Sequence, residues 1–136
     1  MKTLVIGYGN TLREDDGFGV VVASSLVKNP KYKCICAMQL TPELVETIVQ
    51  YQTVIFIDAN LSNSAGVFAV PLEYAENCYG HALLPNTLMT MARKLYGAKT
   101  KYLIFSVGAL SLGYSEELSP PLKEAAKSLI CYLNEC

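Results

Sequence analysis

Residues 53–59 read TVIFIDA, a nearly continuous apolar run that ends in an aspartate. A strand of this kind has no polar face to present to water, so it suits a sheet that is covered on both sides, as parallel sheets are. Along the rest of the chain, strand-like runs alternate with segments whose apolar residues recur at helical spacing. This alternation predicts an α/β fold, with three α/β/α layers around a mostly parallel, twisted sheet of five strands.

The expected elements can be assigned to residue ranges. Strands are predicted at 2–7, 32–38, 53–59, 66–72 and 101–109, and helices at 16–27, from 41–43 onward, at 85–96 and from 119–120 onward. The strand at 66–72 follows 53–59 too closely for a crossover helix, and it contains Pro71. We therefore expect an antiparallel edge strand there. Thr41 is expected to be the N-cap of the second helix, with Pro42 at its first position.

Length and composition limit the classes of protein that the chain can represent. Its 136 residues suit one domain over 1–136, and a content of 51% hydrophobic and 17% charged residues is typical of a globular protein with its own core. A net charge of -1 favours neither nucleic acid nor an anionic membrane as a partner. The five cysteines have no framework spacing, and the N-terminal run has no cleavage signal. We therefore expect free thiols and a cytoplasmic location.

The stretch GYGNTLREDDGFG (7–19) follows the first predicted strand. Glycines at this place usually form a phosphate-binding turn, but the dinucleotide pattern is G-x-G-x-x-G, and Leu12 stands where the third glycine should be. A phosphate would also meet Glu14, Asp15 and Asp16 instead of free N–H groups. We therefore expect no nucleotide. Favourable contact with a helix dipole explains one such acid better than three.

Polar residues at the carboxyl ends of the strands are candidates for chemistry, because sites in such sheets gather at that edge. The connections concerned are 8–16, 38–42, 58–64 and 108–114. Asp58 ends its strand and Asp16 closes the glycine-rich turn, so both are expected there. His81, the only histidine, lies in a stretch without a clear period (73–84), which predicts a loop. One imidazole and two carboxylates suit a divalent borderline metal, and nickel, zinc, iron and cobalt all satisfy this chemistry.

Other interpretations compete with a metal site. Asp58 taken alone is typical of a strand-end acid that bonds a turn, and a lone loop histidine is more often a surface residue. Asp16 and Asp58 could instead share a proton as an aspartic dyad, which requires carboxyls about 3 Å apart. Cys78, three residues before His81, is an alternative nucleophile. The spacing of these residues does not decide among the alternatives.

Three motifs together resemble those of the hydrogenase maturation proteases: GYGNTLREDDGFG, VIFIDAN and GHALLP. The resemblance extends over essentially the whole chain. Proteins of this family are endopeptidases that remove a short C-terminal extension from the large-subunit precursor of nickel–iron hydrogenases after nickel insertion. The resemblance thus implies a protease whose partner is that precursor, which carries the nickel. QLTPEL (39–44), ARKLYG (92–97) and LSPPL (118–122) resemble the branch that serves cytoplasmic bidirectional, NAD-linked hydrogenases.

The resemblance assigns three residues to the active site. Carried over motif by motif, Asp16, Asp58 and His81 are implied to be the catalytic and metal-contacting residues. Many relatives have Glu where this chain has Asp16. The adjacent Asp15 is an alternative for that role, although the position relative to Gly19 favours Asp16. The acids behind the glycine turn would then meet a cation rather than a phosphate.

The glycine turn is implied to shape the substrate site. Gly7 and Gly9 let the backbone pass close to its partner, and Asn10 bonds either its own backbone or the substrate chain. Many relatives have a glycine-rich acidic turn after the second strand, which QLTPEL replaces here. The alternative function is a non-catalytic nickel-binding or hydrogenase-assembly module with the same fold.

Overall fold

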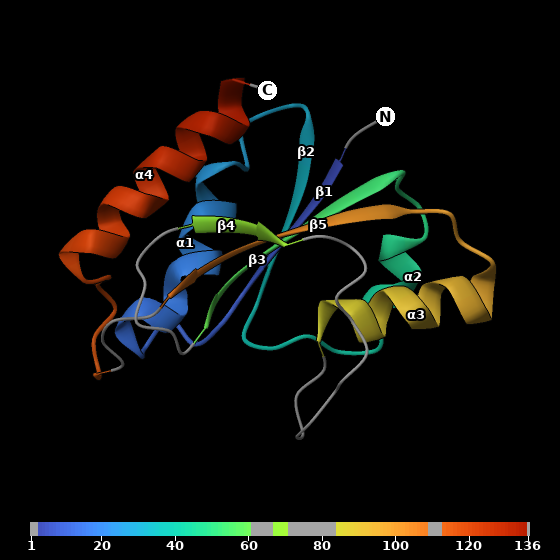
Figure 1. Cartoon of the computed structure of the whole chain (residues 1–136), viewed down its shortest axis with the longest axis horizontal. Helices are drawn as coiled ribbons and strands as arrows, with labels where there is room; N and C mark the ends of the chain where they lie inside the picture. The colour runs from blue at the N-terminus through green and yellow to red at the C-terminus, as the bar shows by residue number, and fades with distance from the viewer. Residues whose placement is uncertain (1–2, 61–66, 71–83, 109–112, 136) are drawn as a thin grey trace.

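A five-stranded sheet forms the centre of the computed structural model, which describes residues 3–60, 67–70, 84–108 and 113–135 (Figure 1). The strands are β1 (Thr3–Tyr8), β2 (Tyr32–Ala37), β3 (Thr53–Asn60), β4 (Val67–Val70) and β5 (Lys101–Gly108). The helices are the 3-10 helix η1 (Glu14–Gly17) and the α-helices α1 (Phe18–Ser25), α2 (Leu44–Ile48), α3 (Pro85–Tyr96) and α4 (Pro120–Glu135).

The strands lie in the order β2-β1-β3-β5-β4. The first four in this order are parallel, and β4 runs antiparallel to β5 at the edge, within the range 66–72 in which an antiparallel edge strand was expected. Because β1, β2, β3 and β5 are parallel, their carboxyl ends meet at one edge of the sheet. The α/β fold with a largely parallel sheet, predicted from the apolar runs, is confirmed.

Helices cover both faces of the sheet, which explains why the strands carry unbroken apolar runs. On one face, α1 and α4 pack against Val5, Ile55 and Ile57. On the other face, α2 and α3 pack against Ile6 and Phe56, which point the opposite way along the same strands. Figure 1 shows the two pairs of helices on opposite sides of the sheet. The three predicted layers are therefore present.

Two helix starts differ from the predictions. The helix expected over 16–27 is shorter, because the acids before it form η1 and α1 begins only at Phe18. Glu14 has a positive φ of 46°, and its N–H bonds to the carbonyl oxygen of Ser115, which holds this segment out of the helix. The second helix begins at Leu44, and Thr41 is not its N-cap: the carbonyl of Thr41 accepts the N–H of Leu44 in a preceding turn.

The third and fourth helices begin where the sequence predicted. Helix α3 spans the predicted 85–96, with Pro85 as its first residue and Gly97 ending it in a left-handed conformation. Helix α4 begins at Pro120, directly after Ser119. In the part of the chain that the structure describes, no helix combines the length and the apolar character that crossing a membrane requires.

Helix α1 lies very close to β1 and β3 because glycines occupy the contact. A Cβ added to Gly19 would overlap the carbonyl oxygen of Ile57, and a Cβ added to Gly7 would overlap the carbonyl oxygen of Gly19. Close packing of this kind is the task of the third glycine in dinucleotide-binding turns, and Gly19 performs it here at a longer spacing. The contact holds the start of α1, and the acids of η1 before it, against the ends of β1 and β3.

We expect Gly19→Ala to lower the free energy of unfolding by at least about 3 kcal/mol, because the sheet backbone at Ile57 must move to admit the methyl group. Gly97→Ala is the matched control. Its added methyl would have no atom within 4 Å, so only the left-handed backbone, at about 1–2 kcal/mol, opposes it. Urea unfolding measures both variants, and equal losses would contradict the close-packing explanation.

Candidate active site

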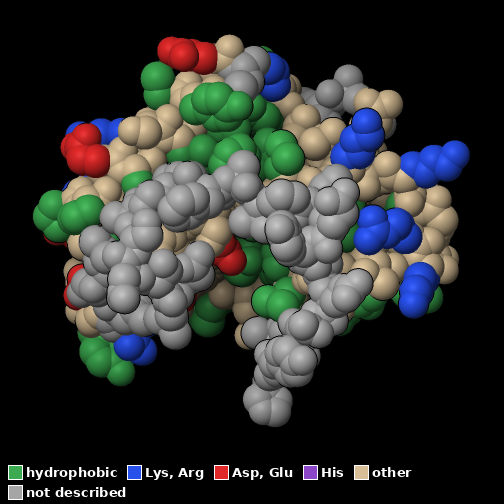
Figure 2. Space-filling view, in the orientation of Figure 1, with side chains coloured by type: hydrophobic (Ala, Val, Ile, Leu, Met, Phe, Trp, Pro, Cys, Tyr) green, Lys and Arg blue, Asp and Glu red, His purple; other side chains and the backbone are tan. Residues whose placement is uncertain are grey.

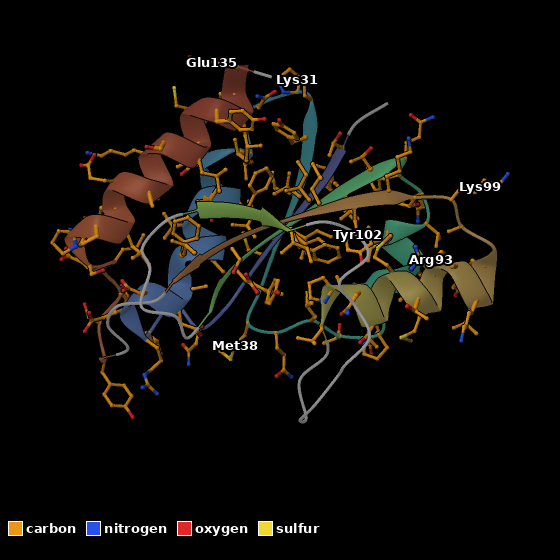
Figure 3. The ribbon with its side chains drawn as sticks, in the orientation of Figure 1. Lys31, Met38, Arg93, Lys99, Tyr102 and Glu135 are labelled. Carbon is orange, nitrogen blue, oxygen red and sulfur yellow. The ribbon has the colours of Figure 1, made fainter. Side chains whose placement is uncertain are left out.

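The ends of β1 and β3 bring Tyr8 and Asp58 together. The hydroxyl of Tyr8 donates a hydrogen bond of 2.6 Å to Oδ2 of Asp58. The 3-10 helix η1 packs against β3 and brings Asp16 to the same place, where its negative charge acts on both residues. Met38, labelled in Figure 3, follows β2 at this edge and is exposed. Two of the predicted site residues, Asp16 and Asp58, are therefore neighbours.

The turn after β1 is built around Gly9. Its φ of 144° is rarely adopted by other residues, and a Cβ there would overlap the backbone oxygen of Asp16. The backbone N–H of Asn10 donates to Oδ2 of Asp16 at 2.7 Å. The side-chain Oδ1 of Asn10 accepts the N–H of Leu12 at 2.9 Å, so Asn10 bonds its own backbone. The turn therefore holds the carboxylate of Asp16 in a defined position.

The three adjacent acids of η1 have three different surroundings. Asp15 is fully buried, and its two oxygens accept the backbone N–H of Ser119 at 2.7 Å and the Ser119 hydroxyl at 2.9 Å. Glu14 lies against Gly113. Asp16 is the one bonded within the turn and acting on the strand ends. Both oxygens of Asp15 are thus engaged at the start of α4, which favours Asp16 as the candidate ligand.

The two oxygens of Asp58 differ in their surroundings. Oδ2 is bonded to Tyr8, whereas Oδ1 is buried and has no hydrogen-bond partner among the described residues. Burial raises the pKa of Asp58. The hydroxyls of Tyr8 and of Ser106, its neighbour in the β3–β5 register, oppose this rise, and the charge of Asp16 adds to it. A buried oxygen without a donor is costly, and contact with a cation would relieve that cost.

Tyr8 is a site residue that the sequence analysis did not identify. Burial raises the pKa of its hydroxyl far above the ordinary value, and the charges of Asp58 and Asp16 raise it further. The hydroxyl therefore stays protonated at physiological pH and acts as a donor. Its position could have marked it as a candidate site residue, because Tyr8 ends a predicted strand and lies between two glycines. Its partner lies 50 residues away, however, and no local pattern reveals it.

His81 and Cys78 lie outside the described residues, so the structure does not place the third predicted ligand or the alternative nucleophile. Within the described ranges, no group of three His, Cys, Asp or Glu side chains could hold a metal ion. The same ranges contain no hydrogen bond between Asp16 and Asp58. Each carboxylate instead uses one oxygen for a donor from β1 or its turn, so the arrangement differs from a dyad with a shared proton.

A surface hollow of about 540 Å³ lies at the opposite, amino edge of the sheet and is lined by residues 49–53 and 99–101. Figure 2 shows Lys and Arg side chains gathered on the side of the molecule where α3 and its connection to β5 lie. The lysines of the hollow, Lys99 and Lys101, are exposed. In the described residues, the buried side-chain atom without a partner is Oδ1 of Asp58, at the other edge. We therefore place the candidate site at the carboxyl edge.

Comparisons with solved structures find this fold in hydrogenase maturation proteases. The [NiFe] hydrogenase maturation protease HycI from Thermococcus kodakarensis KOD1 is 27% identical, with a TM-score of 0.76 over 98% of this chain and 90% of that chain. HycI from Escherichia coli, an endopeptidase, is 15% identical, with a TM-score of 0.78 over 99% and 90% of the two chains. The maturating endopeptidase HybD from E. coli is 20% identical, with a TM-score of 0.75 over 99% and 93%.

Neither a family model nor a curated protein sequence matches the chain. The resemblance to the hydrogenase maturation proteases, which the three motifs predicted, is confirmed by the structural neighbours. The two E. coli proteins share the fold at low identity, and the Thermococcus protein extends the likeness to about a quarter of the residues.

Asp15→Ala should lower the free energy of unfolding by about 2–4 kcal/mol, because it leaves the N–H of Ser119 without its charged acceptor. Asp16→Ala should lower it by about 1 kcal/mol or less, since this carboxylate is only partly buried. Urea unfolding of the two variants tests the assignment of the adjacent acids. A larger loss for Asp16→Ala would reverse it.

Asp58→Asn should make the protein more stable than the wild type near pH 7. A raised pKa means that the folded state holds the proton more tightly, so stability falls as pH rises from about 3.9 through the folded value. The advantage of the variant should therefore shrink as pH falls from the folded pKa toward about 4, and it should be small below that pH. Urea unfolding between about pH 3 and pH 7 measures it, with exposed Glu116→Gln as the control. A constant difference across this range would contradict the burial argument.

Proposed function

Because the chain has the fold of the hydrogenase maturation proteases, we propose that it is an endopeptidase that removes the C-terminal extension of a nickel–iron hydrogenase large-subunit precursor after nickel insertion. The observation that carries this proposal is the buried Oδ1 of Asp58, which lies beside Asp16 and has no partner among the described residues. Two acids at one sheet edge, one of them with an unsatisfied oxygen, suit recognition of a bound cation. The printed names of the structural neighbours support the protease class and the role in hydrogenase maturation.

In the proposed reaction, Asp16, Asp58 and His81 contact the nickel that the precursor carries. Carboxylate oxygens and an imidazole nitrogen suit this ion. Because the nickel arrives with the substrate, the enzyme by itself needs only a partly built site. A nickel-free precursor would offer the two carboxylates no counter-charge, so cleavage would depend on prior nickel insertion. The branch that serves bidirectional, NAD-linked hydrogenases and the cytoplasmic location stay predictions.

Hydrolysis requires a water molecule at the scissile peptide bond. In our proposal, a carboxylate of the Asp16–Asp58 pair takes a proton from this water while the water oxygen attacks the carbonyl carbon. The C–N bond then breaks, and the carboxyl group returns the proton to the leaving nitrogen. The products are the mature large subunit with a new C-terminal carboxyl group and a released peptide with a new amino group.

His81→Ala should reduce cleavage of the nickel-loaded precursor at least about 100-fold, because one of three contacts to nickel is lost. Intact-mass analysis of the precursor measures loss of the C-terminal peptide, and circular dichroism checks that the fold is retained. Cys78→Ala is the control and should cleave normally. The wild type should leave a nickel-free precursor uncut.

Two outcomes would contradict this proposal. Full cleavage by His81→Ala would remove His81 from the site. If the wild type left the loaded cognate precursor uncut, the protein would be the non-catalytic nickel-binding or assembly module instead.

A further inference from the structure

Tyr8 makes the two oxygens of Asp58 different, because it forms a hydrogen bond with only one of them. Its hydroxyl donates to Oδ2 at 2.6 Å, a short distance typical of a charge-assisted hydrogen bond. Oδ1 of the same carboxylate is buried and has no partner among the described residues. With Oδ2 fixed, rotation of the carboxylate is restricted, so Oδ1 occupies a defined position.

We propose that Tyr8 is a positioning residue that holds Oδ2 of Asp58, so that Oδ1 is the atom presented to the nickel of the precursor. This inference rests on the proposed function and adds to it a residue that acts through Asp58 rather than on the substrate. Donors behind a metal-binding carboxylate fix its orientation, and their removal typically lowers metal affinity or activity about 10–100-fold.

The surroundings of Tyr8 suit a permanent donor. Tyr8 is the last residue of β1, where it pairs with Ala37 of β2, and its side chain packs against the core between the sheet and helices α2 and α3. The hydroxyl lies 2.6 Å from Oδ2 of Asp58, and an uncharged tyrosine hydroxyl is a hydrogen-bond donor. The donor therefore stays in place both when Asp58 is charged and when a cation meets Oδ1.

Asp16 is held in a corresponding way. The backbone N–H of Asn10 donates to Oδ2 of Asp16 at 2.7 Å. Tyr8 and Asn10 flank Gly9, so one stretch of three residues orients both carboxylates. The N–H of Asn10 belongs to the backbone and survives any change of its side chain except to proline, whereas the Tyr8 hydroxyl can be removed by a single substitution. Tyr8 therefore offers the direct test.

The test compares Tyr8→Phe with Tyr32→Phe. Both substitutions remove only a hydroxyl group. Tyr32 is the matched control because its hydroxyl donates a buried bond of 2.7 Å to the carbonyl oxygen of Leu133, in the layer formed by α4. Each variant is assayed for kcat and KM on the nickel-loaded precursor and, by calorimetric titration, for the affinity of the enzyme alone for Ni²⁺.

We expect Tyr8→Phe to lower kcat/KM about 10–100-fold and to weaken Ni²⁺ binding by a similar factor, with Tyr32→Phe close to the wild type in both. Equal cleavage and equal Ni²⁺ affinity in Tyr8→Phe and the wild type would overturn the positioning role while leaving the proposed function intact. If the wild type failed to cleave but Tyr8→Phe still weakened Ni²⁺ binding, the proposed protease function would fall and the positioning of Asp58 would stand.

Discussion

The contact between helix α1 and the two central strands determines the geometry of the carboxyl edge. No side chain separates Gly19 from the backbone of Ile57 or from Gly7, so the helix begins directly on the sheet. Helix η1 precedes α1 without a gap, and its acids are therefore carried to the strand ends. A side chain in this contact would force apart the start of α1 and the strand backbone, and η1, which carries Asp16, directly precedes that start.

The candidate site keeps an arrangement that folding alone would not favour. Both oxygens of Asp15 accept hydrogen bonds that stabilise the fold, whereas one buried oxygen of Asp58 has no partner in the part of the chain that the structure describes. Burial and the charge of Asp16 both oppose ionisation of Asp58. Buried polar groups without a hydrogen-bond partner are expected mainly at functional sites, because such a group can still bind a ligand. The proposed ligand, a divalent cation carried by a substrate, is a group that would satisfy it.

What the sequence could predict depends on how local each interaction is. Helix α3 was predicted at its observed bounds because Pro85, Gly97 and the apolar stripe all lie within one segment. The sheet was predicted because each apolar run lies within one short segment and by itself indicates a strand that is buried on both faces. The different surroundings of Asp15 and Asp16 could not be predicted from the sequence. They depend on the hydrogen bonds of Asp15 to Ser119, which is 104 residues away. The donor at the end of β1 was missed for the same reason, and η1 replaced a helical turn because its bonds are made to a distant part of the chain.

The two hydrogen bonds between Asp15 and Ser119 also link the candidate site to the order in which the chain is made. Strands β1 and β3 and helix η1, which carry Tyr8, Asp58 and Asp16, are synthesised early, whereas β5, Ser119 and α4 emerge only afterwards. At about 5–20 residues per second, the 104 residues between the two partners correspond to a delay of about 5–20 s. Until then the segment that carries Asp16 lacks its hydrogen bonds to Ser115 and Ser119. The nascent chain therefore completes this edge after its central strands, when α4 packs against α1.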